Sequence, residues 1–142
     1  MPTATHPTVS SERAIENLIS SYAYLNDDAD ITGLGDLFAD AAFTLDGATA
    51  RGRDQIAERA RAIIQVNDDG TSRTRHHITN LIIEVDEQAG TATARAYWTV
   101  LQSVPGLPQQ PLLAGRYRNR FERRDGAWRF TELNATTTWS AG

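Results

Sequence analysis

The feature that most limits the fold of this chain is a change of sequence pattern at residue 74. From there to residue 139, four long runs rich in β-branched and aromatic residues predict strands. The predicted strands span residues 75–85, 91–102, 111–123 and 127–139. Three turn sequences separate them: residues 86–90, the Pro- and Gly-containing residues 104–110, and the pair Asp125-Gly126. Strands joined in this way predict an antiparallel meander.

The chain before residue 74 shows helical periodicity instead. Apolar residues recur at three- and four-residue steps in its first stretch: Ile15, Leu18, Ile19, Tyr22 and Leu25. They predict a helix capped by Ser10 or Ser11. Asp30 is placed to cap a short second helix, and a third helix is predicted over residues 53–65. Between these two helices, residues 42–46 and 48–51 predict a small hairpin around an Asp46-Gly47 turn.

Helices followed by an antiparallel meander define the fold class as α+β. We expect three N-terminal helices packed on one face of a curved, mostly antiparallel sheet, which gives a cone-shaped α+β barrel. The wide end of such a cone is a natural place for an apolar pocket with a few converging polar groups. The chain has 142 residues, so we expect a flexible lead-in at residues 1–10 and a single domain at residues 11–142.

Charge and composition exclude several classes of function. The 14 basic and 18 acidic residues give a net charge of −4, which argues against binding to nucleic acid or to a membrane surface. The chain has no Cys, which excludes disulfides, a thiolate nucleophile and iron–sulfur sites. It lacks a secretion signal and any apolar run near the roughly 20 residues needed to span a bilayer, so the expected location is cytoplasmic.

Several local motifs resemble one known family. They are Tyr22-Ala23 followed by Asp27-x-x-Asp30, Gly52, Arg75-His76-His77-Ile78-Thr79-Asn80, Ala114-Gly115-Arg116-Tyr117, and Arg124-Asp125-Gly126-Ala127-Trp128-Arg129-Phe130. Over about residues 11–139 the chain resembles the SnoaL-like family of the nuclear transport factor 2-like superfamily. The resemblance implies a cone-shaped fold, frequent homodimers and no obligatory cofactor. It leaves the chemistry open, because the family includes dehydratases, isomerases, polyketide cyclases, epoxide hydrolases, dehydrochlorinases and oxygenase subunits.

The resemblance places a catalytic dyad at Asp27 and His76. A carboxylate bonded to one ring nitrogen fixes the tautomer of a histidine and stabilises the imidazolium, so the pair can act as a general base. The alternative is an Asp that ends a helix and a His satisfied at a strand edge. Asp27, Asp28 and Asp30 crowd the negative end of the helix dipole. Asp30 has a capping role and Asp28 can face water, so Asp27 is the one that needs a partner such as His76.

One position departs from the family. Many relatives place an Arg three residues after the Phe of the Trp-Arg-Phe motif, whereas this chain has Leu133. If that Arg helps a leaving group or an anionic substrate in the relatives, its absence here weakens the case for a substrate with a halide or a carboxylate.

The two adjacent histidines leave one question open. Neighbouring residues on a strand point to opposite faces, so His76 and His77 cannot hold one metal ion without a bulge, and no metal site is predicted. Alternation groups His76 with Ile78, Asn80, Ile82 and Glu84, and His77 with Leu81, Ile83 and Val85. The pattern does not decide which set faces the pocket. The resemblance implies that His76 faces the pocket. A bulge near Ile78 would allow residues of both sets to face inward.

Five residues are candidates to contact a small hydrophobic or aromatic substrate: Tyr22, Asn80, Tyr97, Trp98 and Arg116. Among the aromatic residues Tyr22, Tyr24, Tyr97, Trp98, Phe121 and Trp128, we expect only two or three to reach a ligand, because most belong to the core. The alternating arginines of residues 116–124 are typical of a half-buried strand whose outer side meets solvent or the second subunit of a homodimer.

These observations favour a small, cofactor-independent lyase or isomerase that removes a proton from a largely apolar metabolite and brings about dehydration, isomerisation or cyclisation. One alternative is a non-catalytic ligand-binding protein or an oxygenase-assembly subunit. Another is an epoxide hydrolase-type enzyme in which a carboxylate activates water.

Overall fold

A computed structural model describes residues 9–142, and every predicted helix and strand is present in it. The elements are α1 (Ser11–Asp27), α2 (Ile31–Leu37), β1 (Ala42–Leu45), β2 (Ala48–Arg51), α3 (Gly52–Ile63), β3 (Thr74–Asp86), β4 (Thr91–Gln102), β5 (Gln110–Arg124) and β6 (Ala127–Ser140). The predicted element ends differ from the observed ones by at most two residues. Most of the predicted N-terminal lead-in lies outside the described residues, although Ser10 caps α1 by accepting a 3.1 Å hydrogen bond from the Arg13 amide.

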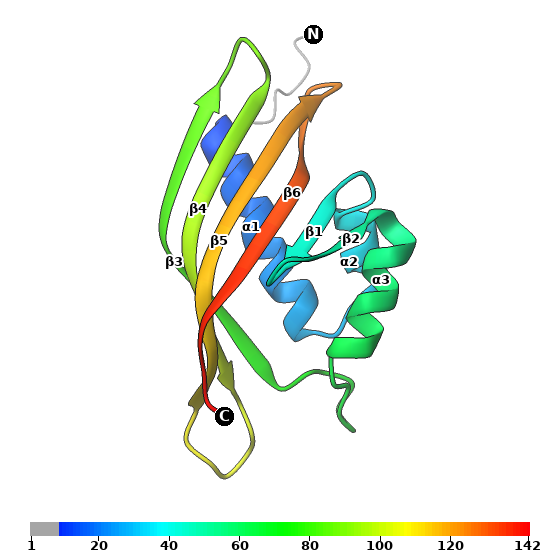
Figure 1. The fold of residues 1–142 in the computed structure, drawn as a ribbon, viewed down its shortest axis with the longest axis vertical. Coiled ribbons are helices and arrows are strands. Elements are labelled where there is room, and N and C mark those ends of the chain that lie inside the picture. Colours follow the sequence, from blue (N-terminus) through cyan, green and yellow to red (C-terminus); the bar gives the residue numbers. More distant parts are fainter. Residues whose placement is uncertain (1–8) are drawn as a thin grey trace, which may run out of the picture.

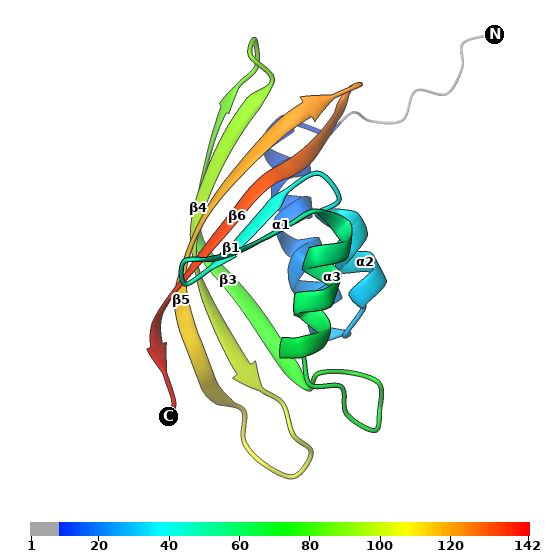
Figure 2. The same ribbon diagram turned by 45° about the vertical axis from the view of Figure 1, so that its right-hand side comes forward.

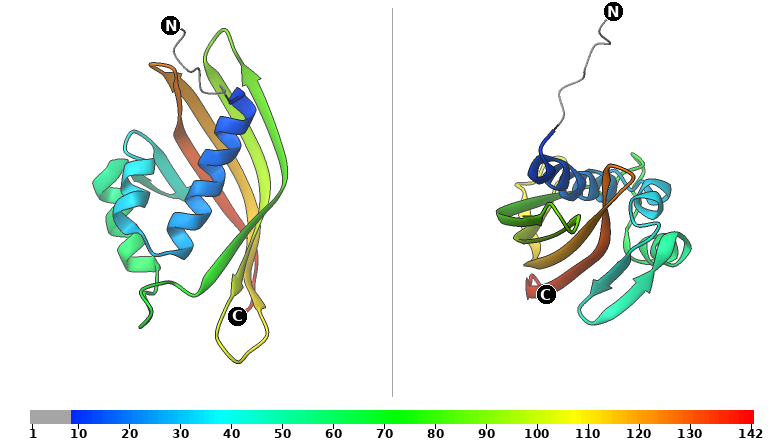
Figure 3. Two further views of the ribbon diagram at one scale, coloured as in Figure 1. Left: turned by 180° about the vertical axis from the view of Figure 1, so that it is seen from behind. Right: turned by 90° about the horizontal axis from the view of Figure 1, so that it is seen from above.

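The strands form one sheet in the order β2-β1-β6-β5-β4-β3. Strands β3 to β6 make the predicted antiparallel meander, and β1 adds to it by pairing with β6 in parallel. All three helices lie on one side of this curved sheet (Figures 1 and 2). Seen from above, the sheet stays open between its β2 and β3 edges (Figure 3). The α+β class is therefore confirmed, with an unclosed cone rather than a closed barrel.

The core lies between the helices and the inner face of the sheet. Its most deeply buried apolar side chains include Ile15, Ile19, Phe38, Phe121, Phe130 and Leu133. The apolar stripe predicted for α1 supplies Ile15, Ile19 and Tyr22 to it, which is why that helix packs along the sheet. None of the helices within residues 9–142 has the length and apolar content needed to cross a membrane.

The β1–β2 hairpin is fixed to the rest of the fold at two points. The Asp46 carboxylate, in the turn, accepts hydrogen bonds from the Thr137 amide at 2.6 Å and from the Thr137 hydroxyl at 2.8 Å. On its other side, Arg59 of α3 donates to the carbonyl oxygens of Ala48 and Phe43. The hairpin and α3 together therefore close one side of the space above the sheet.

A β-bulge divides β3 into two halves. The pairing register with β4 shifts between Thr79 and Ile82, and Asn80 has a φ of 55°, a left-handed conformation that Asn adopts more readily than most residues. Before the bulge, His76 and Ile78 point inward; after it, Leu81, Ile83 and Val85 do. The expected bulge thus exists, two residues beyond Ile78, and it allows both sets of apolar residues to face the core.

Candidate active site

The side chains of Asp27 and His76 meet at the junction of α1 and β3. Asp27 Oδ1 lies 2.6 Å from His76 Nδ1, and Asp27 Oδ2 accepts a 2.8 Å hydrogen bond from the His76 amide. The Thr74 hydroxyl donates to Oδ1 at 2.8 Å. Asp27 is only 8% exposed. Three donors therefore hold a buried carboxylate in one orientation against the imidazole.

The surroundings of Asp27 keep it ionised. Burial is the largest influence and raises its pKa, but hydrogen bonds from the side chain and backbone of His76, the His76 charge and the Thr74 hydroxyl together lower the pKa below its ordinary value. An ionised carboxylate only accepts hydrogen bonds, so the proton in the short contact belongs to His76 Nδ1. In the neutral imidazole, Nε2 then carries the free electron pair.

The loop before β3 positions this pair. Asp27 is the last residue of α1, and its carbonyl oxygen accepts hydrogen bonds from the Ser72 amide at 3.2 Å and the Ser72 hydroxyl at 3.0 Å. The Ser72 hydroxyl also lies 2.6 Å from the Thr74 hydroxyl. These contacts fix the start of β3 on the end of α1, although Asp27 and His76 are 49 residues apart in the sequence.

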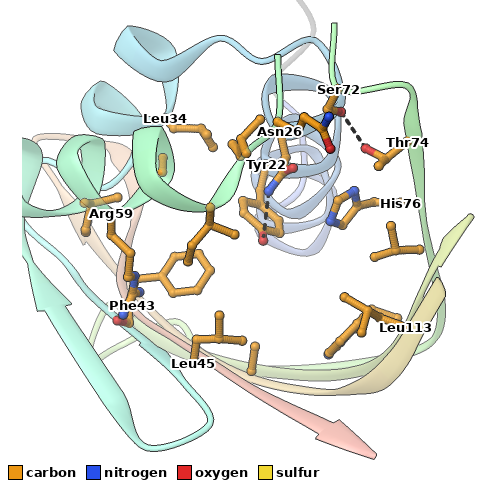
Figure 4. Close-up of a pocket in the computed structure, with 18 of the residues that line it drawn as sticks. Tyr22, Asn26, Leu34, Phe43, Leu45, Arg59, Ser72, Thr74, His76 and Leu113 are labelled. Atoms are coloured by element: carbon orange, nitrogen blue, oxygen red, sulfur yellow. Dashed lines mark hydrogen bonds between the residues drawn. The ribbon is translucent and has the colours of Figure 1, made fainter. Parts of the chain in front are cut away.

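His76 borders a cavity of about 310 Å³ between the helices and the sheet. Most of the lining is apolar. It comes from all three helices, from β1 and from β3 to β6, and it includes Leu34, Phe38, Phe43, Leu45, Ile56, Ala60, Ile63, Trp98, Val100, Leu113 and Ala135. The few polar side chains include Tyr22, Asn26, Arg59, Thr74 and His76 (Figure 4). The size and the composition are those of a small-molecule site.

Tyr22 forms the part of the wall next to His76. Its ring centroid is 6.0 Å from that of His76 in an edge-on arrangement, and Asn26 Nδ2 donates to its hydroxyl at 3.4 Å. Burial raises the pKa of Tyr22 to about 12 despite hydrogen bonds that lower it. The Tyr22 hydroxyl is therefore neutral at physiological pH and can donate a hydrogen bond to a ligand.

Known protein families include one whose profile matches most of this chain. The profile of the SnoaL-like domain matches residues 7–134. The chain belongs to the SnoaL-like family. No match was found among curated protein sequences.

Solved structures of the same fold include proteins named for lyase activity. The chain is similar to a function-unknown protein from Mycobacterium tuberculosis, Rv3472(D26N), at 29% identity and a TM-score of 0.76, over 92% of this chain and 73% of that one. A putative scytalone dehydratase from Novosphingobium aromaticivorans is 25% identical, with a TM-score of 0.73 over 92% and 85%. The hexachlorocyclohexane dehydrochlorinase LinA-type3 from Novosphingobium barchaimii is 25% identical, with a TM-score of 0.73 over 92% and 88%. Such relatives support a small enzyme of lyase type.

In this SnoaL-like protein, two of the five predicted substrate-binding residues line the pocket. They are Tyr22 and Trp98, which is 4% exposed. Tyr97 is 47% exposed and lies on the outer face of the sheet, because neighbours on a strand point to opposite sides. Arg116 pairs with Tyr97 across the strands, and its guanidinium lies 5.4 Å from the Tyr97 ring centroid on that same outer face. Tyr97 and Arg116 therefore do not share a cavity with His76.

Asn80 is also outside the pocket. The bulge turns it outward, where it lines a second hollow, of about 630 Å³, with Tyr97 and Arg116. Its left-handed backbone gives Asn80 a conformational reason to be an Asn at this position. Asn80 was predicted to contact the substrate, but it does not line the cavity that His76 borders.

The other predicted aromatic candidates belong elsewhere in this SnoaL-like protein. Tyr24 is 72% exposed, and Phe121 is buried in the core. Trp128 packs at the edge of the core and donates to the Ser11 hydroxyl at 3.1 Å. Of the six aromatic residues, Tyr22 and Trp98 line the cavity that His76 borders.

Leu133, at the position of the family Arg, is part of the core. It is 1% exposed and pairs with Asn119 on β5 and with Phe43 on β1. β6 therefore adds no positive charge to the cavity at this position. Asn119 is buried opposite it, and neither its amide oxygen nor its amide nitrogen has a protein hydrogen-bond partner within residues 9–142.

Sequence reasoning missed Arg59, which lines the cavity from α3. The signal was available: Ile56, Ala60 and Ile63 form the apolar stripe of that helix, and Arg59 lies three residues after Ile56 on the same side. Within the described part of the chain, no group of three or more His, Asp or Glu side chains is placed to hold a metal ion.

Proposed function

We propose that this SnoaL-like protein is a cofactor-independent lyase or isomerase in which His76 removes a proton from a small, largely apolar metabolite. The observation that carries the proposal is the 2.6 Å contact between buried Asp27 and His76 at the wall of an apolar cavity. The names of the dehydratase and dehydrochlorinase relatives support an elimination reaction.

The proposed step uses His76 Nε2 as the base. Because Nδ1 donates its proton to Asp27, Nε2 can accept a proton from a substrate carbon, and the negative Asp27 stabilises the imidazolium that results. The electron pair of the broken C–H bond forms a new double bond. In a dehydration, a neighbouring hydroxyl leaves and takes the proton from His76 as water. In an isomerisation, His76 returns the proton to another carbon.

Two further side chains have roles in this proposal. Tyr22, neutral at physiological pH, donates a hydrogen bond to an oxygen of the substrate and so stabilises charge that develops there. Thr74 holds the Asp27 carboxylate in the orientation that His76 needs, and we class it as a positioning residue.

Activation of water by Asp27 is the weaker hypothesis. Both oxygens of Asp27 already accept hydrogen bonds from His76 and Thr74, and Asp27 does not line the cavity. A base needs a free electron pair within reach of the proton that it abstracts. His76, which does border the cavity, meets that requirement.

The test is hydrogen exchange in D2O across a panel of small hydroxy ketones and hydroxy acids, monitored by ¹H NMR. We expect the wild type to exchange or eliminate at least one of them, and His76→Gln to lose at least about 100-fold in rate. His77→Gln is the matched control, because His77 lies on the exposed face of the same strand. Equal rates for wild type and His76→Gln would contradict the proposal, and absence of any turnover together with tight binding would favour a non-catalytic ligand-binding protein.

A further inference from the structure

We propose that Arg59 is a substrate-binding residue that pairs with a carboxylate at the end of the cavity opposite His76. The inference rests on the proposed function and narrows its substrate class to small apolar carboxylic acids. Such a substrate would place its acidic C–H group at His76 and its carboxylate at Arg59.

The position of Arg59 on α3 is the first observation. Ile56, Ala60 and Ile63 line the cavity from the same side of the helix. A charged residue within such an apolar stripe is unusual, because taking a charge out of water is unfavourable unless an opposite charge or good hydrogen bonds compensate. Its place in the wall therefore needs an explanation beyond helix formation.

Hydrogen bonds to the protein fix the guanidinium of Arg59 without using all of its N–H groups. It donates to the Ala48 carbonyl at 2.7 Å and to the Phe43 carbonyl at 2.5 Å, and its central carbon lies 4.8 Å from the centroid of the Phe43 ring. A guanidinium has five N–H groups in a planar fork. The two carbonyl contacts therefore fix its orientation and use two of the five N–H groups, which leaves three that can bind an anionic ligand.

Within residues 9–142, no acidic side chain balances the charge of Arg59. No ion pair within residues 9–142 includes Arg59. The acidic group of the proposed site, Asp27, is bonded to His76 and Thr74. Desolvation lowers the pKa of Arg59, which is the expected effect of an uncompensated, partly buried cation. A bound anion would supply the missing charge.

The arrangement of the cavity suits a bifunctional ligand. Arg59 and His76 lie on opposite sides of the Tyr22 ring in the close-up of the pocket (Figure 4). In the same view (Figure 4), Phe43 and Leu45 lie on the Arg59 side of the pocket, and Leu113 lies on the His76 side. A molecule with an apolar body and one carboxylate fits this order of groups. A hydrocarbon would leave Arg59 without a negative partner.

A role limited to anchoring the hairpin makes a different prediction. Arg59 also links α3 to β1 and β2, so its removal is expected to lower stability in either case. Only the ligand-binding role predicts that the protein distinguishes a carboxylate from a neutral molecule of the same shape. The test must therefore measure selectivity as well as stability.

The experiment titrates the protein with cyclohexanecarboxylate and, separately, with cyclohexanecarboxamide, at pH 8 and followed by ¹H–¹⁵N NMR. We expect the wild type to bind the carboxylate at least about tenfold more tightly, a difference of about 1.4 kcal/mol. The Arg59 Nε–H signal should shift with the carboxylate only. Equal affinity of the wild type for both probes, or binding of neither at millimolar concentration, would overturn the inference without any variant.

Three variants locate the selectivity. Arg59→Gln should bind both probes equally, and Arg59→Lys should keep part of the preference because it keeps the charge. Arg61→Gln, which changes an exposed arginine of the same helix, should behave like the wild type. Preserved selectivity in a folded Arg59→Gln would overturn the inference.

A fourth variant separates this inference from the proposed function. His76→Ala should lose turnover yet keep its preference for the carboxylate. If the preference vanishes in His76→Ala and persists in Arg59→Gln, the carboxylate binds at His76 and the assignment to Arg59 is wrong. Neither probe carries a leaving group, so failure of the catalytic proposal leaves the result of this binding experiment unchanged.

Discussion

The carboxylate of Asp27 accepts hydrogen bonds from both the backbone amide and the side chain of His76, at 2.8 Å and 2.6 Å. The backbone contact places the start of β3 on the end of α1, and the side-chain contact orients the imidazole. One residue thus fixes both the position of the strand and the tautomer of the histidine on it.

Replacement of Asp27 by Asn should remove the basic nitrogen from the cavity. The amide oxygen of the new side chain would keep the bond to the His76 backbone, and its NH2 group would then face Nδ1 and Thr74. This arrangement favours the tautomer with its proton on Nε2, which cannot accept another. We expect at least about a 100-fold loss in kcat/KM, measured on any substrate found in the D2O screen. Asp28→Asn, at the residue that follows α1, is the control, and wild-type activity in Asp27→Asn would contradict the dyad.

The lowered pKa of Asp27 predicts a pH-dependent contribution to stability. Since the folded-state pKa lies below that of the unfolded chain, the contribution is fully present above the unfolded value of about 4 and is lost as the pH falls through the folded value. The difference in free energy of unfolding between wild type and Asp27→Asn should therefore shrink below about pH 4. Urea unfolding across this pH range measures it, and a difference that stays constant would show that the Asp27 pKa is not lowered.

Gly115 should not tolerate a side chain. A Cβ atom at this position would overlap the carbonyl oxygen of Thr136 and the indole of Trp98, which lines the cavity. Gly115→Ala should lower the free energy of unfolding by about 1–3 kcal/mol or more and displace Trp98. Thermal unfolding and Trp fluorescence measure the two effects. Gly142→Ala, whose Cβ meets no other atom, should leave both unchanged; a stable Gly115→Ala with unaltered fluorescence would contradict the crowding.

Asn119 should be replaceable with a gain in stability. Its side chain is buried, and both of its amide atoms lack protein hydrogen-bond partners in residues 9–142. Because an unsatisfied buried polar group is unfavourable by about 1–3 kcal/mol, Asn119→Leu should raise the free energy of unfolding by a similar amount. Asn134→Leu, on the outer face, should change it by less than about 0.5 kcal/mol. A clear loss of stability in Asn119→Leu would show that the amide is satisfied in solution.

Local sequence patterns were enough to predict the elements of this fold but not their full arrangement. Two predictions that depend only on short segments are confirmed. They are the helix predicted from the apolar period of α1 and the turn at Asp125-Gly126 between β5 and β6. The parallel pairing of β1 with β6 joins segments about 90 residues apart in the chain, and no local pattern encodes it.

The candidate site was predicted in part for the same reason. The contact of Asp27 with His76 followed from the family resemblance, and the inward direction of His76 needed the bulge at Asn80, which simple alternation cannot place. Tyr97 and Trp98 were both proposed for the pocket although adjacent strand residues diverge. Arg59 was missed because only the apolar residues on that side of α3 were considered as part of the wall, and the charged residue among them was not. The catalytic roles and the homodimer stay predictions.

The bulge at Asn80 makes β3 two functional segments within a single strand. Residues before it present His76 to the cavity, and residues after it pack Leu81, Ile83 and Val85 into the interior. Because the left-handed residue absorbs the change of direction, we expect substitutions after the bulge to leave the orientation of His76 unchanged. To alter the chemistry of this protein, a designer can therefore substitute residues of the first segment and keep the sequence of the second.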